Sequence, residues 1–160
     1  MTEIKKVAFL GMGVMGFPMA GHLAAKGFDV VVYNRTASKA ETWVTEHGGA
    51  AALTPRDAAT GRHVVFACVG NDDDVREVVM GTDGAFNGMD EGSIFVDHTT
   101  ASATLALELE ELAKTKGIDF LDAPVSGGQA GADNGVLTVM CGGNQKVFEI
   151  AKPAMESYSR

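Results

Sequence analysis

Long hydrophobic runs, cysteines and clusters of basic residues are all scarce in this sequence of 160 residues. No stretch of about eighteen apolar residues occurs, so the sequence holds no candidate transmembrane helix. The apolar run after Lys5 and Lys6 is short and interrupted by glycine, which matches a secretory signal peptide poorly. Cys68 and Cys141 lie far apart, and neither has a partner at metal-ligand spacing. These absences favour a reduced, cytoplasmic protein without a metal site.

Positive charge is scarce too, because 13 lysines and arginines stand against 21 aspartates and glutamates, for a formal net charge of −8. Nucleic-acid binding normally needs a concentrated basic face, which this sequence does not offer. Apolar material is plentiful: 46% of the residues are hydrophobic, which is enough for the core of one ordinary domain. We therefore expect a single domain with no nucleic-acid or membrane partner.

Short apolar segments alternate along the chain with longer segments of helical periodicity. The expected strands are 7–10, 30–33, 64–69, 94–96, 118–121 and 137–141, and the expected helices are 14–26, 37–47, 55–60, 73–80, 101–116 and 145–157. The strands are nearly continuous in Val, Ile and Phe, as expected when both faces of a sheet are covered. The alternation predicts an α/β fold of the Rossmann type, a doubly wound and mostly parallel sheet in one domain over residues 1–160. Thr54 before Pro55 predicts a helix start, and Pro153 predicts a kink or restart in the last helix.

Three glycines follow the first expected strand, in the pattern Gly11-x-Gly13-x-x-Gly16. Between a strand and a helix this spacing is typical of a dinucleotide-binding turn: Gly11 makes the tight turn, Gly13 admits a pyrophosphate and Gly16 lets the helix pack closely. The N-terminus of the helix then offers N–H groups and a positive dipole end to phosphates. A glycine-rich turn can also be purely structural, but its place before the first helix favours cofactor binding. The Gly-Lys-Ser/Thr ending of a nucleoside-triphosphate loop is missing.

The end of the second expected strand, VVVYNRT, bears on the choice between NAD and NADP. Asn34 lies where an NAD-specific site usually has an acidic residue for the ribose 2′-hydroxyl. Here the position is neutral, Arg35 follows with a guanidinium suited to a phosphate, and Thr36 adds a hydroxyl. The pattern favours NADP, with NAD as the alternative cofactor. The structural alternative is a solvated Arg35 and a Thr36 that caps the next helix.

Further candidate residues follow the later strands, because the carboxyl ends of parallel strands face the ligand crevice in a doubly wound sheet. We expect Cys68, Val69 and Gly70 to line the cofactor mainly with backbone atoms. The three aspartates at 72–74 are expected to cap a helix and to charge its first turn, rather than to bind a metal.

Hydroxyl groups and glycines mark the next two segments at the crevice. Thr99 and Thr100 are candidates for a substrate carboxylate or the nicotinamide amide, and equally for capping the helix that follows. His98, between a strand and a helix, is expected to be structural. The sequence SGG at 126–128 offers a hydroxyl and permissive N–H groups that suit a carboxylate, and its alternative is a simple glycine turn before the last strand.

Together, the segments FLGMGVMGFPMA, NRT, DHTT and DAPVSGGQAGADNGVLTVMCGG resemble the β-hydroxyacid dehydrogenases, which include 3-hydroxyisobutyrate dehydrogenase, tartronate semialdehyde reductase and the glyoxylate/succinic semialdehyde reductases. The resemblance implies a Rossmann-type domain followed by an all-helical domain that builds a homo-oligomer. It also implies reversible hydride transfer between NAD(P) and a short 3-hydroxy acid or semialdehyde. By motif position it implies cofactor contacts from Gly11, Met12, Gly13, Val14, Met15, Gly16, Asn34, Arg35, Thr36, Cys68, Val69, Gly70, Val75 and Thr100, and substrate contacts from Thr100, Ser126, Gly127 and Gly128.

The family's catalytic lysine has no counterpart in this sequence. By the resemblance it lies shortly beyond Arg160, since Lys146 and Lys152 belong to the last expected helix. These 160 residues are therefore expected to bind a dinucleotide but to be inactive alone, because the general acid/base and half of the pocket are missing.

Three alternatives stay open beside the β-hydroxyacid dehydrogenases. The 6-phosphogluconate dehydrogenases share NRT and VSGG, but they have a Gly-Gly-Asn-Ser type of sequence after the aspartate where this chain has DHTT at 97–100. Imine reductases share the architecture and replace the catalytic lysine. A non-catalytic dinucleotide-binding module is the third alternative.

Overall fold

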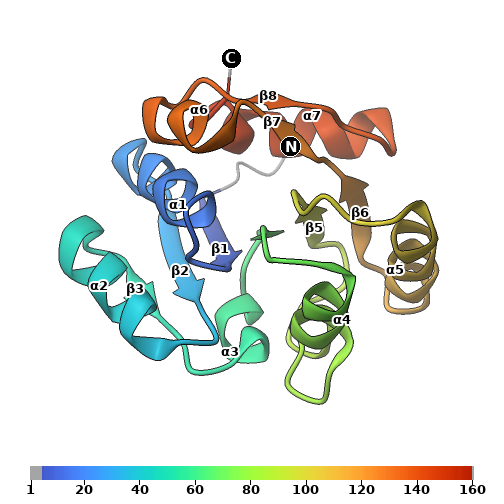
Figure 1. The fold of residues 1–160 in the computed structure, drawn as a ribbon. Helices are drawn as coiled ribbons and strands as arrows, with labels where there is room; N and C mark the ends of the chain where they lie inside the picture. The colour runs from blue at the N-terminus through green and yellow to red at the C-terminus, as the bar shows by residue number, and fades with distance from the viewer. Residues whose placement is uncertain (1–4, 160) are drawn as a thin grey trace.

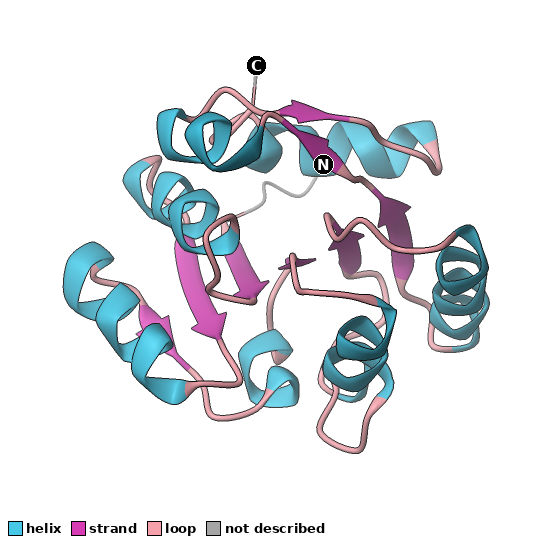
Figure 2. Cartoon of the chain, viewed as in Figure 1, coloured by secondary structure: helices cyan, strands magenta, loops and turns pink. Residues whose placement is uncertain are grey.

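The computed structural model describes residues 5–159, which form an open parallel sheet with helices on both faces (Figure 1, Figure 2). Residues 1–4 and Arg160, at the two ends of the predicted domain, lie outside the described part. Within it, six strands are ordered β3-β2-β1-β4-β5-β6, and every neighbouring pair is parallel. The strands are β1 Lys6–Leu10, β2 Asp29–Tyr33, β3 Ala50–Ala51, β4 Val64–Ala67, β5 Ile94–Asp97 and β6 Asp119–Asp122. This is the strand order of a doubly wound Rossmann sheet, so the predicted fold class is confirmed.

Helices connect the strands and bury both faces of the sheet. They are α1 Gly16–Ala25, α2 Ala37–His47, α3 Pro55–Ala59, α4 Asp72–Met80, α5 Ala103–Thr115, α6 Gly128–Asn134 and α7 Gln145–Met155, with a 3-10 turn η1 at Ala85–Asn87. One apolar cluster contains Phe9 and Trp43 and joins α1, α2, α6 and α7 to one face. A second cluster contains Leu10 and Phe95 and joins α3, α4 and α5 to the other face. Because neighbouring residues of a strand point to opposite faces, both Phe9 and Leu10 are buried, which explains the continuous apolar pattern.

The predicted strand at 137–141 is present only as the two residues Thr138–Val139 (β8), and it does not join the parallel sheet. Val125–Ser126 (β7) instead pairs antiparallel with Thr138–Val139 (β8) in a separate two-stranded sheet. The cause lies between them, where Gly127 and Gly128 take φ angles of +132° and +63° and turn the chain into α6, a helix that was not predicted. The chain then returns alongside β7 instead of adding a seventh parallel strand.

The helix ends confirm one predicted cap and correct several others. Thr54 caps α3, and its Oγ1 accepts the Asp57 N–H at 3.0 Å. The cap of α5 is Ser102, not Thr99 or Thr100, because the Ser102 Oγ accepts the N–H three residues later at 3.1 Å. The cap of α4 is Asn71, and the aspartates at 72–74 occupy the first turn, where their charge suits the helix dipole.

The last helix does not restart at Pro153, since α7 continues through it to Met155. Proline removes a backbone N–H and crowds the carbonyl four residues earlier. At this position it affects only the final turn, so little of the helix remains to be broken. Among residues 5–159, none of the helices has both the length and the apolar character needed to cross a membrane.

Candidate functional site

The glycine turn lies where the sheet reverses its strand order, with β2 on one side of β1 and β4 on the other. Gly11 has a φ angle of +102°, which favours glycine, and its N–H donates to the Tyr33 carbonyl at 2.8 Å. A Cβ on Gly11 would collide with the carbonyl oxygen of Cys68, and a Cβ on Gly16 would collide with the carbonyl oxygen of Gly11. The tight turn and the close approach of α1 to β1 therefore depend on these two glycines.

Gly13 is a glycine for a different reason. A Cβ built on it would meet no described atom within 4 Å, so packing inside the protein does not require glycine here. The residue lines a cleft together with Val14 and Met15, directly before α1. The first turn of any α-helix has N–H groups without intrahelical partners, and these suit an anion. Gly13 leaves the backbone open to a ligand at this end of the helix.

The cleft has a volume of about 360 Å³ and is formed by the ends of β1, β2 and β4 together with α4. Its lining residues are Gly11, Gly13, Val14, Met15, Tyr33, Asn34, Arg35, Cys68, Val69, Gly70, Asp74, Glu77 and Val78. The volume lies within the usual range of small-molecule sites, about 300–1,000 Å³. Three predicted segments that are distant in sequence, 11–15 without the buried Met12, 34–35 and 68–70, thus meet at one cleft.

Asn34 braces the glycine turn from the end of β2. Its Oδ1 accepts the Met12 N–H at 2.9 Å, and its Nδ2 donates to the Thr36 carbonyl at 3.0 Å. An aspartate would accept the first hydrogen bond but has no donor for the second when ionised. Thr36 takes the N-cap position of α2, where its side chain makes no capping hydrogen bond with the described residues. The neutral Asn34 thus has a structural role at the turn.

Arg35 reaches the opposite wall of the cleft, where its Nη1 lies 3.5 Å from Oδ1 of Asp74. The predictions missed Asp74, Glu77 and Val78, which line the cleft from one face of α4. They also missed Tyr33, the last residue of β2. Burial raises the pKa of Tyr33, Glu77 adds to the rise and Arg35 opposes it. The signal that could have found Asp74 and Glu77 is their i, i+3 spacing on the helix that follows β4, which puts both side chains on one face.

The loop after β4 is held by hydrogen bonds from its neighbours. The Cys68 N–H donates to the Leu10 carbonyl at 3.0 Å, and the Val69 N–H donates to Oγ1 of Thr99 at 3.0 Å. Burial, followed by the nearby carboxylate of Asp97, raises the pKa of Cys68 to about 12. The thiol therefore stays protonated at neutral pH and offers the cleft an apolar contact rather than a nucleophile.

Behind the cleft, His98 is buried, as expected for a structural histidine. Its Nδ1 lies 2.6 Å from the Ala123 carbonyl and its Nε2 lies 2.6 Å from the Tyr158 hydroxyl. Because a carbonyl only accepts, Nδ1 carries the proton and Nε2 accepts from the tyrosine. Burial lowers the pKa of His98 to about 4 and raises the pKa of the adjacent Asp97 to about 6, although Asp97 accepts hydrogen bonds from Thr99.

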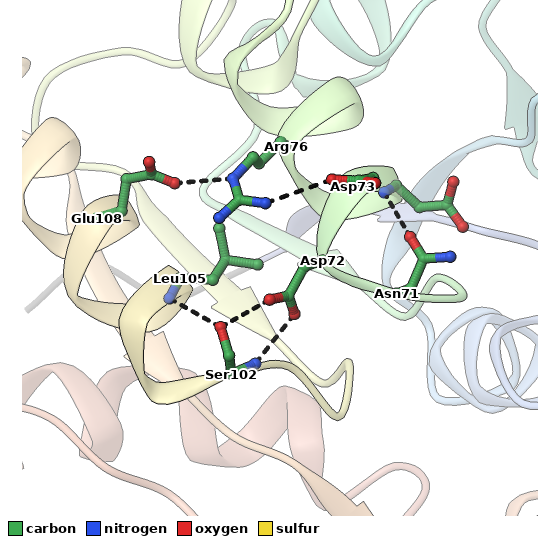
Figure 3. A network of polar contacts seen from close by, with 8 residues as sticks. Asn71, Asp72, Asp73, Arg76, Ser102, Leu105 and Glu108 are labelled. Atoms are coloured by element: carbon green, nitrogen blue, oxygen red, sulfur yellow. Dashed lines mark hydrogen bonds and ion pairs between the residues drawn. The ribbon is translucent and has the colours of Figure 1, made fainter.

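A polar network away from the cleft fixes the start of α4 against α5 (Figure 3). The carboxylate of Asp72 accepts from the N–H of Ser102 at 3.0 Å and from its hydroxyl at 2.6 Å. Arg76 adds a bridge to Glu108 at 3.0 Å. Among the described residues, no group of three or more His, Cys, Asp or Glu side chains is arranged to hold a metal ion. Asp72 thus holds the start of α4 against the start of α5.

The other predicted contact residues do not line this cleft. Gly16 is buried against the glycine turn, and Val75 is buried on the core-facing side of α4. Thr100 is exposed just beyond β5. The segment 126–128 is exposed at β7 and the start of α6. Thr100 and this segment are thus accessible to solvent.

Comparison with known proteins identifies the family. Residues 6–160 match the family model described as the NAD-binding domain of 6-phosphogluconate dehydrogenase. An uncharacterised oxidoreductase of Shewanella frigidimarina is 61% identical over 155 residues, which cover 97% of this chain and 53% of that protein. The solved structure of Mycobacterium tuberculosis 3-hydroxyisobutyrate dehydrogenase with L-serine has a TM-score of 0.89 at 32% identity, covering 99% of this chain and 53% of its own. The structure of Psf3 in complex with NADP+ and 2-OPP has a TM-score of 0.89 at 28% identity, covering 96% and 54%.

The chain spans about half the length of the curated relatives that it matches. The family model covers the glycine turn, the cleft and every strand of the sheet. A relative named 3-hydroxyisobutyrate dehydrogenase-like, from Arabidopsis thaliana, confirms the predicted resemblance at 38% identity over 95% of this chain and 50% of that protein. The chain therefore belongs to the family of NAD-binding domains found in 6-phosphogluconate dehydrogenase and in the 3-hydroxyisobutyrate dehydrogenase-like oxidoreductases.

Proposed function

We propose that this domain binds NADP(H) in preference to NAD(H), as the cofactor half of an oxidoreductase that acts on a short 3-hydroxy acid or semialdehyde. The observation that carries the proposal is the position of Arg35, which lines the same cleft as the glycine turn. A guanidinium there suits the 2′-phosphate that distinguishes NADP from NAD. Asn34 puts no negative charge at the position where NAD-specific sites usually have one.

The residues of the cleft fit a dinucleotide. Gly13 leaves room for a pyrophosphate, and the N-terminus of α1 offers it N–H groups. Arg35 would hold the 2′-phosphate, and the segment 68–70 would line the remainder of the cofactor. When bound, the nicotinamide supplies or accepts the hydride, and the protein positions it.

The substrate half of the proposal rests on family likeness and on Thr100 with the segment 126–128. Their exposed hydroxyl groups and glycine N–H groups suit a carboxylate. L-serine, present in the related M. tuberculosis structure, is a short acid that carries a 3-hydroxyl group. We propose that a helical domain supplies the catalytic lysine and the contacts for a homo-oligomer, with the cytoplasm as the site of action.

Arg35→Ala is expected to weaken NADPH binding at least about tenfold, because a charge-assisted pair with a phosphate is worth about 1.5–3 kcal/mol. NADH binding should change by less than about twofold, since NADH lacks the 2′-phosphate. Calorimetric titration of the chain with both cofactors at fixed salt measures the two effects. Arg56→Ala is the matched control, since Arg56 is exposed on α3 and does not line the cleft.

Equal binding of NADPH and NADH by the parent chain would refute the NADP preference and keep the dinucleotide site. Binding of neither cofactor would refute the site itself. The substrate class is tested by NADPH absorbance in a protein that also carries the helical domain, with a short semialdehyde as one substrate and 6-phosphogluconate as the other. Turnover of 6-phosphogluconate alone would refute the 3-hydroxy acid assignment and indicate a 6-phosphogluconate dehydrogenase.

A further inference from the structure

The charges around Arg35 do not match a site built only for a phosphorylated ribose. Asp74 and Glu77 line the same cleft, so one positive and two negative side chains face it. A 2′-phosphate adds about 1.5 to 2 negative charges at neutral pH. A carboxylate of the protein can therefore compete with the 2′-phosphate for the guanidinium of Arg35.

The Asp74 carboxylate is held in place beside Arg35. The backbone N–H of Asp74 donates to Oδ1 of Asn71 at 2.9 Å, which fixes the residue in the first turn of α4. Its side chain is 25% exposed, whereas that of Arg35 is 72% exposed. Gly70 makes room for the carboxylate, because a Cβ there would lie 2.7 Å from Oδ2 of Asp74. Asp74 is thus the fixed member of the pair, and Arg35 is the member that water and ligands reach.

The neighbouring aspartates do not share this position. Asp72 faces Ser102 on α5, and Asp73 is 95% exposed beside Arg76. Of the three, Asp74 alone lines the cleft. The pairing with Arg35 is therefore specific to one carboxylate and is not a general effect of an acidic helix end.

We propose that Asp74 is a specificity-determining residue that limits the preference for NADP(H) over NAD(H) by pairing with Arg35. The inference rests on the proposed function, because that proposal assigns Arg35 to the 2′-phosphate. A 2′-phosphate must displace Asp74 from the guanidinium of Arg35 or share the guanidinium with it, and Glu77 adds a second negative charge to the same cleft. The 2′-hydroxyl of NAD(H) makes no such demand and can donate a hydrogen bond to a carboxylate.

Asp74→Asn is expected to tighten binding of 2′,5′-ADP about fivefold, because exposed ion pairs are worth up to about 1 kcal/mol. Binding of 5′-AMP should change by less than about twofold, since this nucleotide differs from the first only by the 2′-phosphate. Both half-cofactors are titrated calorimetrically into the chain at fixed salt. Asp73→Asn is the matched control, because it removes the same charge one residue away and should change both affinities by less than about twofold.

The same titrations in an Arg35→Ala background test the mechanism. If Asp74 acts through Arg35, Asp74→Asn should give no gain for 2′,5′-ADP once Arg35 is absent. An equal gain in that background, or an equal gain from Asp73→Asn, would overturn the inference. Asp74→Ser provides a second variant without the charge, should Asp74→Asn lower the Tm.

Failure of the inference is distinguishable from failure of the proposed function. A parent chain that prefers 2′,5′-ADP through Arg35 but gains nothing from Asp74→Asn or Asp74→Ser keeps the function and overturns the role of Asp74. A parent chain that binds neither nucleotide overturns both.

Discussion

Gly16→Ala is expected to lower the free energy of unfolding by about 3 kcal/mol and the Tm by about 6–12 °C. The added Cβ would collide with the Gly11 carbonyl oxygen and lie 3.1 Å from the ring of Phe9. Neither neighbour can retreat easily, because the Gly11 N–H is bonded to Tyr33 and Phe9 lies within β1 at the centre of the sheet. Thermal and urea unfolding followed by circular dichroism measures the loss.

Gly13→Ala is the matched control, since it makes the same substitution three residues earlier. Its Cβ meets no described atom within 4 Å, so the free energy of unfolding should change by less than about 1 kcal/mol. Dinucleotide binding should nevertheless weaken at least about tenfold, because the methyl group lies on the cleft where the pyrophosphate must approach. Equal destabilisation by the two substitutions would contradict the assignment of a packing role to Gly16 and a ligand-binding role to Gly13.

The pH dependence of stability is expected to change in Asp97→Asn, whose free energy of unfolding should fall by about 2 kcal/mol more than that of the parent between pH 6.5 and pH 4. Burial lowers the pKa of His98 from 6.5 to about 4. Between these values the unfolded chain binds a proton on His98 that the folded chain does not, so acidification favours unfolding. The adjacent Asp97 normally offsets this loss.

Asp97 acts in the opposite direction, because burial raises its pKa from 3.8 to about 6. Between pH 6 and 4 the folded chain binds a proton on Asp97 that the unfolded chain lacks, so acidification through this group favours folding. The two contributions are similar in size and nearly cancel in the parent. An asparagine takes up no proton but keeps the oxygen that accepts the Thr99 N–H at 2.9 Å, so the variant reveals the contribution of His98.

Urea unfolding at pH 4, 5, 6 and 7 measures this difference in the parent and in Asp97→Asn. The double variant Asp97→Asn/His98→Gln is the control, and the difference from the parent should largely disappear in it, because both titrating groups are gone. His98→Gln alone should gain stability on acidification relative to the parent, through Asp97. Parallel curves for the parent and Asp97→Asn would show that the two groups do not titrate as described.

The glycine turn was predictable from sequence because its signals are local. The spacing of Gly11, Gly13 and Gly16 after an apolar strand indicates both the turn and its place in the sheet, and the structure puts it at the reversal of strand order. The position of Asp74 and Glu77 in the lining of the cleft was not predictable in the same way. All three aspartates at 72–74 carry the same helix-start signal, and only the folded structure distinguishes Asp72, which bonds Ser102, from Asp74, which lines the cleft.

The helix α6 escaped prediction for a related reason. Its sequence, GQAGADN, is short, has four poor helix formers (two glycines, an aspartate and an asparagine) among seven residues, and shows no apolar periodicity. Tertiary contacts support it instead: Ala132 is buried in the core, and Nε2 of His22 on α1 lies 2.9 Å from the Ala132 carbonyl. A helix formed by contact with a distant segment leaves no local pattern to read.

The contact between His98 and Tyr158 also has a consequence during protein synthesis. The two residues are 60 positions apart. A ribosome adding about 5–20 residues per second makes the second about 3–12 s after the first. Until α7 and Tyr158 emerge, the face of the sheet that contains Phe66 and His98 lacks the cover that these residues provide. A nascent chain of this domain therefore passes through an interval in which one face of its central strands is accessible to chaperones and to neighbouring chains, until α7 and Tyr158 cover it.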